Sequence, residues 1–492
     1  MTVSQRAFET VWCPALAGLA LCAAAGCGPH DAAPMHGTQN GVAGAMPVAA
    51  AMGLAGNGGG MAIAGSSAAS AGSIMPPVAA GRTGGASGVG AASGSAGRTA
   101  GGAGAAGRDA GAGAPTSAGA DAGANAAGRG GGAPAAAGSG TALPSAPGYV
   151  HTQGAKLLDS QGREVRLTGV SWFGMETPNY APYGLANRSL GSLLDQIKTL
   201  GFNTIRLPFS NQLFDAASKP TIGGNQNSDL TGLSGLQLMD KIVQAAGQRG
   251  LRIILDRHRP DSNAQSELWY TSPYGEQRWI DDWKMLATHY KSDATVIGAD
   301  LHNEPRGMAT WGDGNAATDW QLAAQRAGNA ILQINSNWLI IVEGIEKYAD
   351  DYYWWGGNLI AAGSHPVQLA VANRVVYSTH DYPPSLYAQT WFSATDYPNN
   401  LPSVWSRYWG YLAEQDIAPV FVGEFGTKLQ SDPDKKWLHA LAGYIAQHNL
   451  SWAFWCFNPN SGDTGGILQD DWTTVNQDKM NELKPILAPL IQ

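Results

Sequence analysis

The sequence reads VIGADLHNEP over residues 296–305, and a second run of the same kind, 418–426, reads APVFVGEFG. Both runs are short and mostly apolar and end at Pro or Gly, which indicates buried strands. Each run places a glutamate, Glu304 or Glu424, where the chain leaves the strand. Chemistry in a parallel barrel is done at the C-terminal ends of the strands, so the two runs predict a barrel with two carboxylates on one rim.

Strand-like and helix-like stretches alternate along the rest of the chain, from residue 167 to residue 490. Eight strands separated by amphipathic helices predict an α/β fold, a (β/α)8 TIM barrel. An open doubly wound sheet is the alternative, but no glycine-rich phosphate loop follows the first strand. The predicted strands are 167–172, 204–208, 252–256, 296–301, 339–342, 375–378, 420–423 and 452–457; the predicted helices are 189–200, 233–249, 276–290, 316–334, 404–415, 435–447 and 478–490, and the connection 350–374 carries no long helix.

Residues 28–147 precede the barrel and consist mainly of Gly, Ala and Ser, without any Trp, Tyr, Phe, Lys, Glu or Cys. Such a segment buries too little apolar surface to offset the entropy lost on ordering, so we predict a disordered linker that acts as a tether. The folded domain is then 148–492, which fits one large barrel. Two alternating runs near its start, 156–159 and 164–167, are joined by a glycine-containing turn and predict a small capping β-hairpin.

Residues 1–27 have the features of an export signal, with Arg6 near the start and an apolar run, 15–25, too short to span a bilayer. The segment ends in Ala-Ala-Gly-Cys, which resembles a bacterial lipobox with Ala where Leu is usual. Lipidation at Cys27 would attach the protein to a membrane, whereas ordinary cleavage would release it. Lipidation is the favoured interpretation, and either outcome predicts a secreted or cell-surface protein.

The net charge of −8 comes without a basic stripe, which argues against nucleic acid as a partner. Three of the four cysteines fall within residues 1–27, so Cys456 is predicted to be a buried residue without a disulfide. No group of His and Cys residues has zinc spacing. We therefore expect no metal and no cofactor, and a monomeric protein.

Five motifs occur in a set order along the barrel: DRHRPD at 256–261, LHNEP at 301–305, STHDY at 378–382, GEFG at 423–426 and FWCFNPNSGDTGGIL at 454–468. Together they resemble glycoside hydrolase family 5, and within it the bacterial endo-β-1,4-glucanases, or cellulases. The resemblance covers essentially all of residues 149–492. It implies hydrolysis of β-1,4-glycosidic bonds by double displacement, with retention of configuration.

The resemblance also implies roles for individual residues. Glu304 matches the acid/base, whose pKa a second carboxylate about 5 Å away is expected to raise, and Glu424 matches the nucleophile. Arg206 matches the arginine that binds the nucleophile and keeps its pKa low, and Tyr382 is expected to donate a hydrogen bond to the same carboxylate. The other implied site residues are Asn303 at the sugar 2-hydroxyl, His258 and His380 as hydrogen-bonding groups and Trp455 as a flat surface for a sugar ring.

Two further tryptophans, Trp172 and Trp355, are predicted to be sugar platforms, with core packing as the alternative. Glu343, at the end of the fifth predicted strand, is the main rival to the two glutamates, although it lacks their Asn-Glu-Pro or Gly-Glu-Phe-Gly setting. Asp463, in the last loop, is expected to shape that loop or to contact substrate. The other rival carboxylates are Glu176, Glu267 and Glu346.

The leading prediction is therefore a retaining endo-β-1,4-glucanase that acts on β-glucan polysaccharide. The nearer alternative is the same fold and mechanism acting on mannan or xyloglucan. A surface-tethered glycan-binding protein without turnover is an alternative of another class. The presence of both glutamates together with Arg206 and Tyr382 favours the enzyme.

Overall fold

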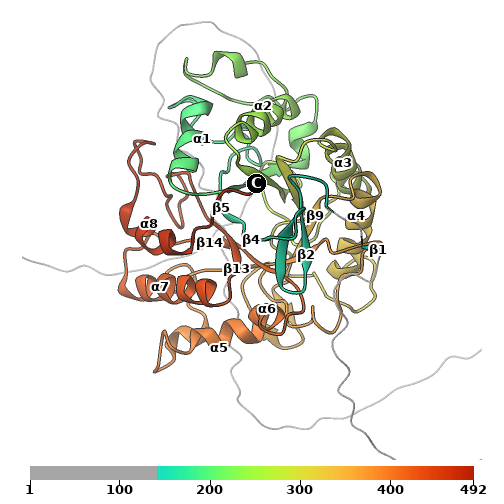
Figure 1. Ribbon diagram of the computed structural model, residues 1–492, viewed down its shortest axis with the longest axis vertical. Helices are drawn as coiled ribbons and strands as arrows, with labels where there is room; N and C mark the ends of the chain where they lie inside the picture. Colours follow the sequence, from blue (N-terminus) through green and yellow to red (C-terminus); the bar gives the residue numbers. More distant parts are fainter. Residues whose placement is uncertain (1–140, 143–144) are drawn as a thin grey trace, which may run out of the picture. The chain divides into compact units, whose positions relative to one another are not determined.

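A computed structural model describes residues 141–142 and 145–492 of the protein. The domain is built around a closed barrel of eight parallel strands (Figure 1). The strands follow one another around the barrel in chain order, and the last pairs with the first through Phe454 and Val170. The TIM-barrel prediction is thus confirmed, while the predicted export signal and nearly all of the linker lie outside the described residues. The barrel strands are β5 (Thr168–Ser171), β6 (Thr204–Ser210), β7 (Arg252–Arg259), β8 (Val296–Asp300), β9 (Leu339–Glu343), β13 (Val375–Asp381), β14 (Val420–Phe425) and β15 (Ser451–Phe454).

Several outer helices begin where the sequence supplies an N-cap. Ser189, Ser234, Asp319 and Ser431 each accept a hydrogen bond from the backbone N–H three residues further on. The Asp319 cap explains why the fourth helix begins at Trp320 and not at the predicted residue 316. The helices are α1 (Leu190–Thr199), α2 (Gly235–Gly247), α3 (Glu276–His289), α4 (Trp320–Ile334), α7 (Asp432–Gln447) and α8 (Gln477–Leu483), with 3-10 turns at Asn211–Phe214, Ser228–Leu230, Thr390–Ser393 and Lys484–Ile486.

Two predicted helices differ from the structure. The helix predicted at 404–415 consists of α5 (Leu401–Trp405), a π-helical turn (Ser406–Gly410) and α6 (Tyr411–Glu414). The helix predicted to run to residue 490 ends at Leu483, because Pro485 removes a backbone N–H donor in the next turn.

The connection between β9 and β13 contains no helix, as predicted. It carries a small antiparallel hairpin, β10 (Lys347–Tyr348) with β11 (Asp351–Tyr352), and the short strand β12 (Val371–Ala372). β12 pairs in parallel with β1 (Thr141–Ala142), which lies inside the predicted linker. Thr141 and Ala142 of the predicted linker are therefore paired with a strand of the barrel domain.

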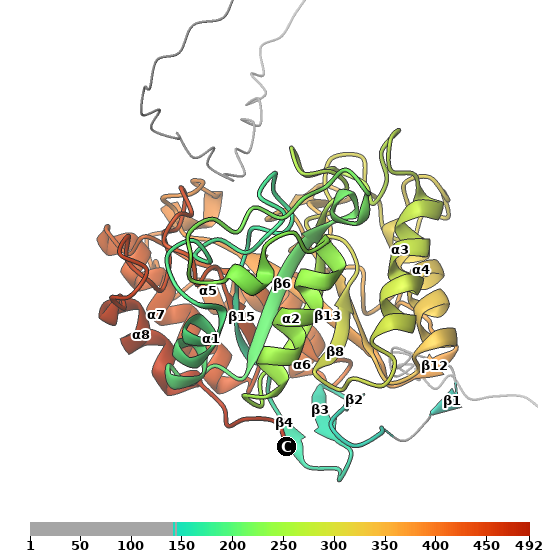
Figure 2. The ribbon, with the colours of Figure 1, turned by 90° about the horizontal axis from the view of Figure 1, so that it is seen from above.

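The predicted capping hairpin is a three-stranded antiparallel sheet made of β2 (Val150–Gln153), β3 (Lys156–Asp159) and β4 (Glu164–Val165). Thr152 donates its backbone N–H to the carbonyl of Asn373, just before β13 begins. The sheet therefore covers the N-terminal end of the barrel, opposite the rim expected to carry the chemistry (Figure 2).

Large apolar side chains fill the space between the barrel and its helices, including many fully buried tryptophans. The barrel interior is different near the C-terminal ends of the strands, where Arg206, Asp256, Asp300 and Glu343 are all fully buried. Buried charges are retained only where they are paired and hydrogen-bonded, so this layer marks the part of the barrel built for chemistry. Within the described residues, no helix combines the length and the apolar character needed to cross a membrane.

Candidate active site

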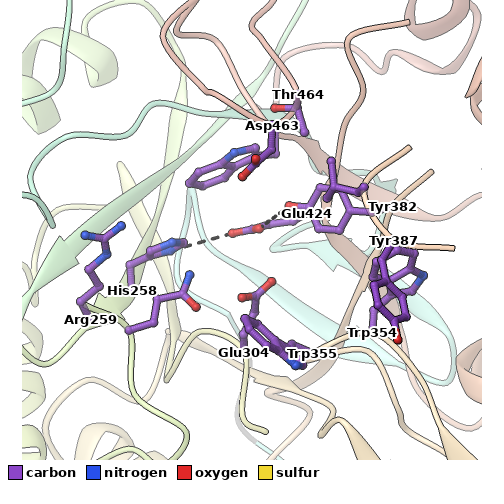
Figure 3. Close-up of a pocket in the computed structure, with 13 residues that line it drawn as sticks. His258, Arg259, Glu304, Trp354, Trp355, Tyr382, Tyr387, Glu424, Asp463 and Thr464 are labelled. Atoms are coloured by element: carbon purple, nitrogen blue, oxygen red, sulfur yellow. Dashed lines mark hydrogen bonds and ion pairs between the residues drawn. The ribbon is translucent and has the colours of Figure 1, made fainter. Parts of the chain in front are cut away.

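A cavity opens at the C-terminal ends of the barrel strands (Figure 3). Glu304 and Glu424 both face into it, one from the loop after β8 and the other from β14. Loops after β7, β9, β13 and β15 supply the surrounding walls. The lining residues are His258, Arg259, Gln265, Glu304, Trp354, Trp355, Tyr382, Leu386, Tyr387, Glu424, Trp455, Asp463 and Thr464.

Glu304 has a left-handed backbone, with φ of 52°, which is unusual for a residue other than glycine. Neighbouring groups hold this conformation: its N–H donates to Glu343 Oε2 at 2.7 Å, and its carbonyl accepts from Arg306 Nη1 at 3.0 Å. Gly356 packs so closely that a Cβ there would lie 2.4 Å from Glu343 Oε2 and 3.1 Å from the Glu304 Cα. The backbone strain is therefore stabilised by a buried carboxylate and a close glycine contact.

Glu424 is held from two sides. Arg206 Nη1 forms an ion pair with Glu424 Oε1. The Tyr382 hydroxyl donates to Glu424 Oε2 at 2.7 Å (Figure 3). Both contacts occupy carboxylate oxygens, so they fix the direction in which the group faces. The interactions predicted for Arg206 and Tyr382 are both present.

The two glutamates share one neighbour, His380. The register of β13 against β14 places His380 directly beside Glu424. Its Nδ1 lies 3.2 Å from Glu304 Oε1 and 3.6 Å from Glu424 Oε2. Oxygens of Glu304 and Glu424 lie within 4.8 Å of each other, close to the spacing of retaining glycosidases and too close for the inverting class.

His380 and Glu304 shift each other's pKa in opposite directions. Burial lowers the pKa of His380, but the adjacent Glu343, Glu424 and Glu304 carboxylates outweigh burial and raise it well above its ordinary value. Burial raises the pKa of Glu304, yet the hydrogen bond and charge of His380 outweigh it, so the pKa of Glu304 is lowered. The predicted rise in the pKa of Glu304 from a second carboxylate is therefore not seen, because the hydrogen bond and charge of His380 lower it.

A buried charge network surrounds Arg206. Its guanidinium lies 3.1 Å from Asp256, 2.8 Å from Asp300 and 3.1 Å from Glu343, and strand register places Asp256 beside Asp300. Burial raises the pKa of Asp300 and of Glu343 to about 7 and that of Asp256 well above its usual range, in spite of the arginine. Carboxyl groups outnumber the guanidinium, so part of this network stays protonated at neutral pH.

His258 is a neutral hydrogen-bonding group. Its Nδ1 lies 2.7 Å from Asp256 Oδ2, and burial lowers its pKa to about 3. The imidazole stacks on Trp455 with ring centres 5.2 Å apart, and Phe173 stacks on Trp455 at 5.4 Å. Trp455 therefore has a fixed orientation at the cavity wall.

Apart from Trp172, each predicted site residue either lines this cavity or lies buried against its glutamates or their partners. Trp172 is fully buried, donates its indole N–H to the carbonyl of Tyr183 at 2.9 Å and packs edge-on against Phe457. Its predicted role as a sugar platform is wrong, because no part of the ring reaches the cavity. Those that line the cavity are His258, Glu304, Trp355, Tyr382, Glu424 and Trp455, whereas Arg206, Asn303 and His380 are fully buried and contact the glutamates or their partners.

The rival carboxylates lie away from the cavity lining. Glu343 binds the backbone of Glu304 and the side chain of Arg206, and Glu176 accepts the N–H of Gly174 at 2.7 Å while fully buried. Glu267 and Glu346 accept backbone N–H groups of the loop after β8. Glu343 is thus a supporting residue and not a third group facing the cavity.

The sequence predictions missed Asp256 and Asp300, although both carried a signal. Each is an acidic residue that directly follows a buried apolar run, 253–255 or 296–299. A buried carboxylate needs a partner, and Arg206 is a cation that both contact. Tyr387 was also missed, and an aromatic residue in a loop after a barrel strand carries too little information alone. The guanidinium of Arg306 lies 4.1 Å from the ring centre of Trp355, a contact that no sequence pattern indicated.

Three groups of buried side chains bring possible metal ligands within 4.8 Å of one another: Asp256, His258 and Glu424; Glu304, His380 and Glu424; and Asp256, Asp300 and Glu343. Each group contains carboxylates that Arg206 or His380 already contacts. A cation bound there would have to displace these hydrogen bonds beside a permanent positive charge, so the geometry fits an ion-pair network better than a metal site.

A TIM barrel with two carboxylates this close at its C-terminal rim, one bound by arginine and tyrosine, defines a glycoside hydrolase of the retaining class. Comparison with known proteins agrees with this class. A family model described as cellulase (glycosyl hydrolase family 5) matches residues 158–461. The chain therefore belongs to glycosyl hydrolase family 5.

Individual relatives are similar over the barrel. An endoglucanase of Paenibacillus polymyxa is 57% identical over 353 residues, covering 70% of this chain and 89% of the relative. The major extracellular endoglucanase of Xanthomonas campestris pv. campestris is 41% identical over 355 residues, covering 70% of this chain and 73% of the relative. The solved catalytic domain of the Xanthomonas protein superposes with a TM-score of 0.66 at 40% identity, covering 69% of this chain and 99% of that one. A cellotetraose complex of the endocellulase from Pyrococcus horikoshii gives 0.65 at 40% identity, covering 70% of this chain and all of the other.

Proposed function

We propose that this protein is a retaining endo-β-1,4-glucanase in which Glu304 is the general acid/base and Glu424 is the nucleophile. The observation that carries the proposal is the pair of carboxylates within 4.8 Å of each other at the cavity. This spacing suits direct attack on an anomeric carbon and leaves no room for the water that an inverting enzyme places between its carboxylates. The similarity to endoglucanases and to an endocellulase that binds cellotetraose supports β-1,4-glucan as the substrate.

In the first step, Glu424 attacks the anomeric carbon as the glycosidic bond breaks, and Glu304 gives its proton to the departing sugar oxygen. Arg206 and Tyr382 keep the attacking carboxylate in position. In the second step, Glu304 takes a proton from water, and the water oxygen displaces Glu424 from the anomeric carbon. Two displacements restore the original β configuration.

Glu304 receives its proton from His380, whose Nδ1 lies 3.2 Å from Glu304 Oε1. His380 is already fully buried, and a sugar chain that fills the cavity removes the remaining water from Glu304, which is 4% exposed. Lower polarity disfavours charged His380 beside charged Glu304 and favours neutral imidazole beside the carboxylic acid. Substrate binding thus prepares the acid that the first step needs.

Other side chains suit the recognition of one sugar ring. Trp455 lines the cavity in a fixed orientation, and Trp355 is backed by the Arg306 guanidinium. Asn303 accepts a hydrogen bond from Arg206 at 3.0 Å, while its Nδ2 has no hydrogen-bond partner among the described residues. A sugar 2-hydroxyl would satisfy that buried donor, and this contact strengthens towards the transition state.

Two measurements test the proposed activity. A panel of soluble β-1,4-glucan, mannan and xyloglucan, followed by reducing-sugar release, should show the highest kcat/KM on the glucan. NMR of the first product should show the β anomer before mutarotation. A preference for mannan or xyloglucan would change the substrate, an initial α anomer would exclude retention, and binding of every polymer without turnover would leave a glycan-binding protein.

For the part of the chain before the barrel, we propose an export signal at 1–27 and a flexible tether from residue 28, followed by a monomeric catalytic domain. The Xanthomonas relative is a major extracellular endoglucanase, which supports secretion. Lipidation at Cys27 would keep the enzyme on a membrane surface. Mass spectrometry of the protein from its native membrane fraction, looking for an acylated Cys27, distinguishes attachment from release.

A further inference from the structure

A second cleft lies on the same rim of the barrel as the cavity with the two glutamates. Its walls are the hairpin β10–β11 on one side and the loop after β13, residues 387–391, on the other. Tyr387 lines both the second cleft and the cavity, so the two hollows meet at this residue. We call the second cleft the aromatic groove.

The floor of the aromatic groove is a rigid stack of rings. Tyr353 stacks against Tyr408 with ring centres 4.3 Å apart and against Trp391 at 5.3 Å, both at an angle of 23°. The Tyr353 hydroxyl donates to Asp381 and accepts the indole N–H of Trp409 at 3.0 Å. Asp381 lies between His380 and Tyr382 in the chain, so the groove floor and the catalytic residues share one support.

The wall of the groove presents an exposed aromatic ring. Tyr352 is 42% exposed and is one of the three exposed large hydrophobic side chains among the described residues. Lys347 Nζ lies 4.8 Å from the centre of the Tyr352 ring. Trp391 and Tyr387 are half-buried beside it. Carboxylates also line the groove, at Glu346, Asp350 and Asp351.

We propose that the aromatic groove binds the part of a β-1,4-glucan chain that leaves in the first step, beyond the sugars held in the cavity; this inference rests on the proposed function. Sugar rings present apolar faces and hydroxyl edges, which match aromatic rings flanked by carboxylates that accept hydrogen bonds. The acidic residues disfavour polyanions such as nucleic acids or uronic acid polymers, so a neutral glycan is the occupant that the charge fits.

The position of the acid/base sets the direction of the chain. Glu304 must protonate the oxygen of the departing sugar, so the departing arm starts on the side of Glu304. Trp355 lies next to Glu304, and Tyr387 continues that side of the cavity, whereas Asp463 and Thr464 lie on the other side of Glu424 (Figure 3). The arm that passes Tyr387 into the aromatic groove is therefore the departing arm.

Three variants test the groove with a series of cello-oligosaccharides and a soluble glucan. Tyr352→Ala removes the exposed ring, Tyr352→Phe keeps the ring and removes its hydroxyl, and Leu490→Ala truncates an exposed side chain outside both hollows. For Tyr352→Ala, we expect kcat/KM to fall about three- to tenfold on the long oligosaccharides and the polymer, and to match wild type on the shortest cleaved chain. Leu490→Ala should stay within twofold of wild type on every substrate. Tyr352→Phe keeps the aromatic ring, so it should lose less than Tyr352→Ala on the long chains.

The outcomes separate the groove from the proposed function. If wild type cleaves β-1,4-glucan and Tyr352→Ala shows the same dependence on chain length, the groove proposal is wrong and the glucanase stands. An equal loss on chains of every length would mean that Tyr352 supports the cavity, which also overturns the groove. No cleavage of any β-1,4-glucan by wild type would remove both proposals.

Discussion

Glu343→Gln changes a buried side chain that contacts both the backbone of Glu304 and the arginine that pairs with Glu424. In the native protein, Glu343 Oε2 accepts the N–H of Glu304 at 2.7 Å, and Glu343 Oε1 accepts from Arg206 Nη2 at 3.1 Å. Glutamine has the same shape but only one acceptor oxygen, because its other terminal group donates. Either the Glu304 N–H or the Arg206 guanidinium must then face a donor.

The magnitude follows from the cost of a buried donor without an acceptor, about 1–3 kcal/mol. Glu343 is fully buried and does not line the cavity, so substrate affinity should change little. The substitution should instead displace Glu304 and Glu424 from the positions that the transition state needs. We therefore expect kcat to fall by about 5- to 100-fold, with KM within about threefold of wild type.

The assay measures kcat and KM on soluble β-1,4-glucan for wild type, Glu343→Gln and Glu482→Gln. Glu482 is a matched control on α8, where its carboxylate pairs only with His439 on the surface among the described residues. Thermal unfolding of each variant separates a positioning effect from loss of fold. A Glu343→Gln enzyme with native kcat, or with its whole loss in KM, would refute the reasoning.

Further predictions concern roles, pH, metals and the domain boundary. With an activated aryl glycoside and azide, Glu304→Ala should yield the β-glycosyl azide through the covalent intermediate, and Glu424→Gly the α-glycosyl azide by a single displacement; the opposite configurations would exchange the two roles. Burial raises the pKa of Glu176 to about 7, so the folded state binds this proton more tightly and the unfolding free energy should fall as pH rises from about 4.5 to 7. In denaturant titrations, Glu176→Gln should remove this loss of unfolding free energy: relative to wild type, the variant should gain up to about 3 kcal/mol above pH 7 and nothing near pH 4. The same difference between variant and wild type at both pH values would contradict the prediction. Activity should survive dialysis against a chelator, and loss restored by a divalent cation would reveal a metal. Limited proteolysis should stop close to Thr141, where β1 pairs with β12, with full activity on soluble substrate; cleavage running on to residue 148 would show that this pairing is weak.

The sequence alone was sufficient for the barrel, because its evidence is local. Short apolar runs ending at Pro or Gly, separated by amphipathic stretches, indicate strand and helix from neighbouring residues only. Glu304 and Glu424 could be chosen for the same reason, since each ends such a run. Where the prediction erred at helix ends, Asp319 and Pro485 supplied the deciding cap or break.

What the sequence could not supply depends on residues that are distant in the chain. Trp172 has the same residue type and a similar local setting as Trp355, yet one is enclosed in the core and the other lines the cavity. The supporting role of Glu343 needs Arg206 on β6 and Glu304 after β8 to meet it, which only closure of the barrel brings about.

The protonation of the site shows the same division. The residue types at the strand ends are written in the sequence, and they limit the chemistry to a pair of carboxylates with an arginine, a tyrosine and histidines. Whether Glu304 or His380 holds the proton is decided by distances of 3–4 Å between β8, β13 and β14 and by the removal of water from all of them. Electrostatic energies depend on separation and on burial, and both quantities come into existence only when the chain has folded.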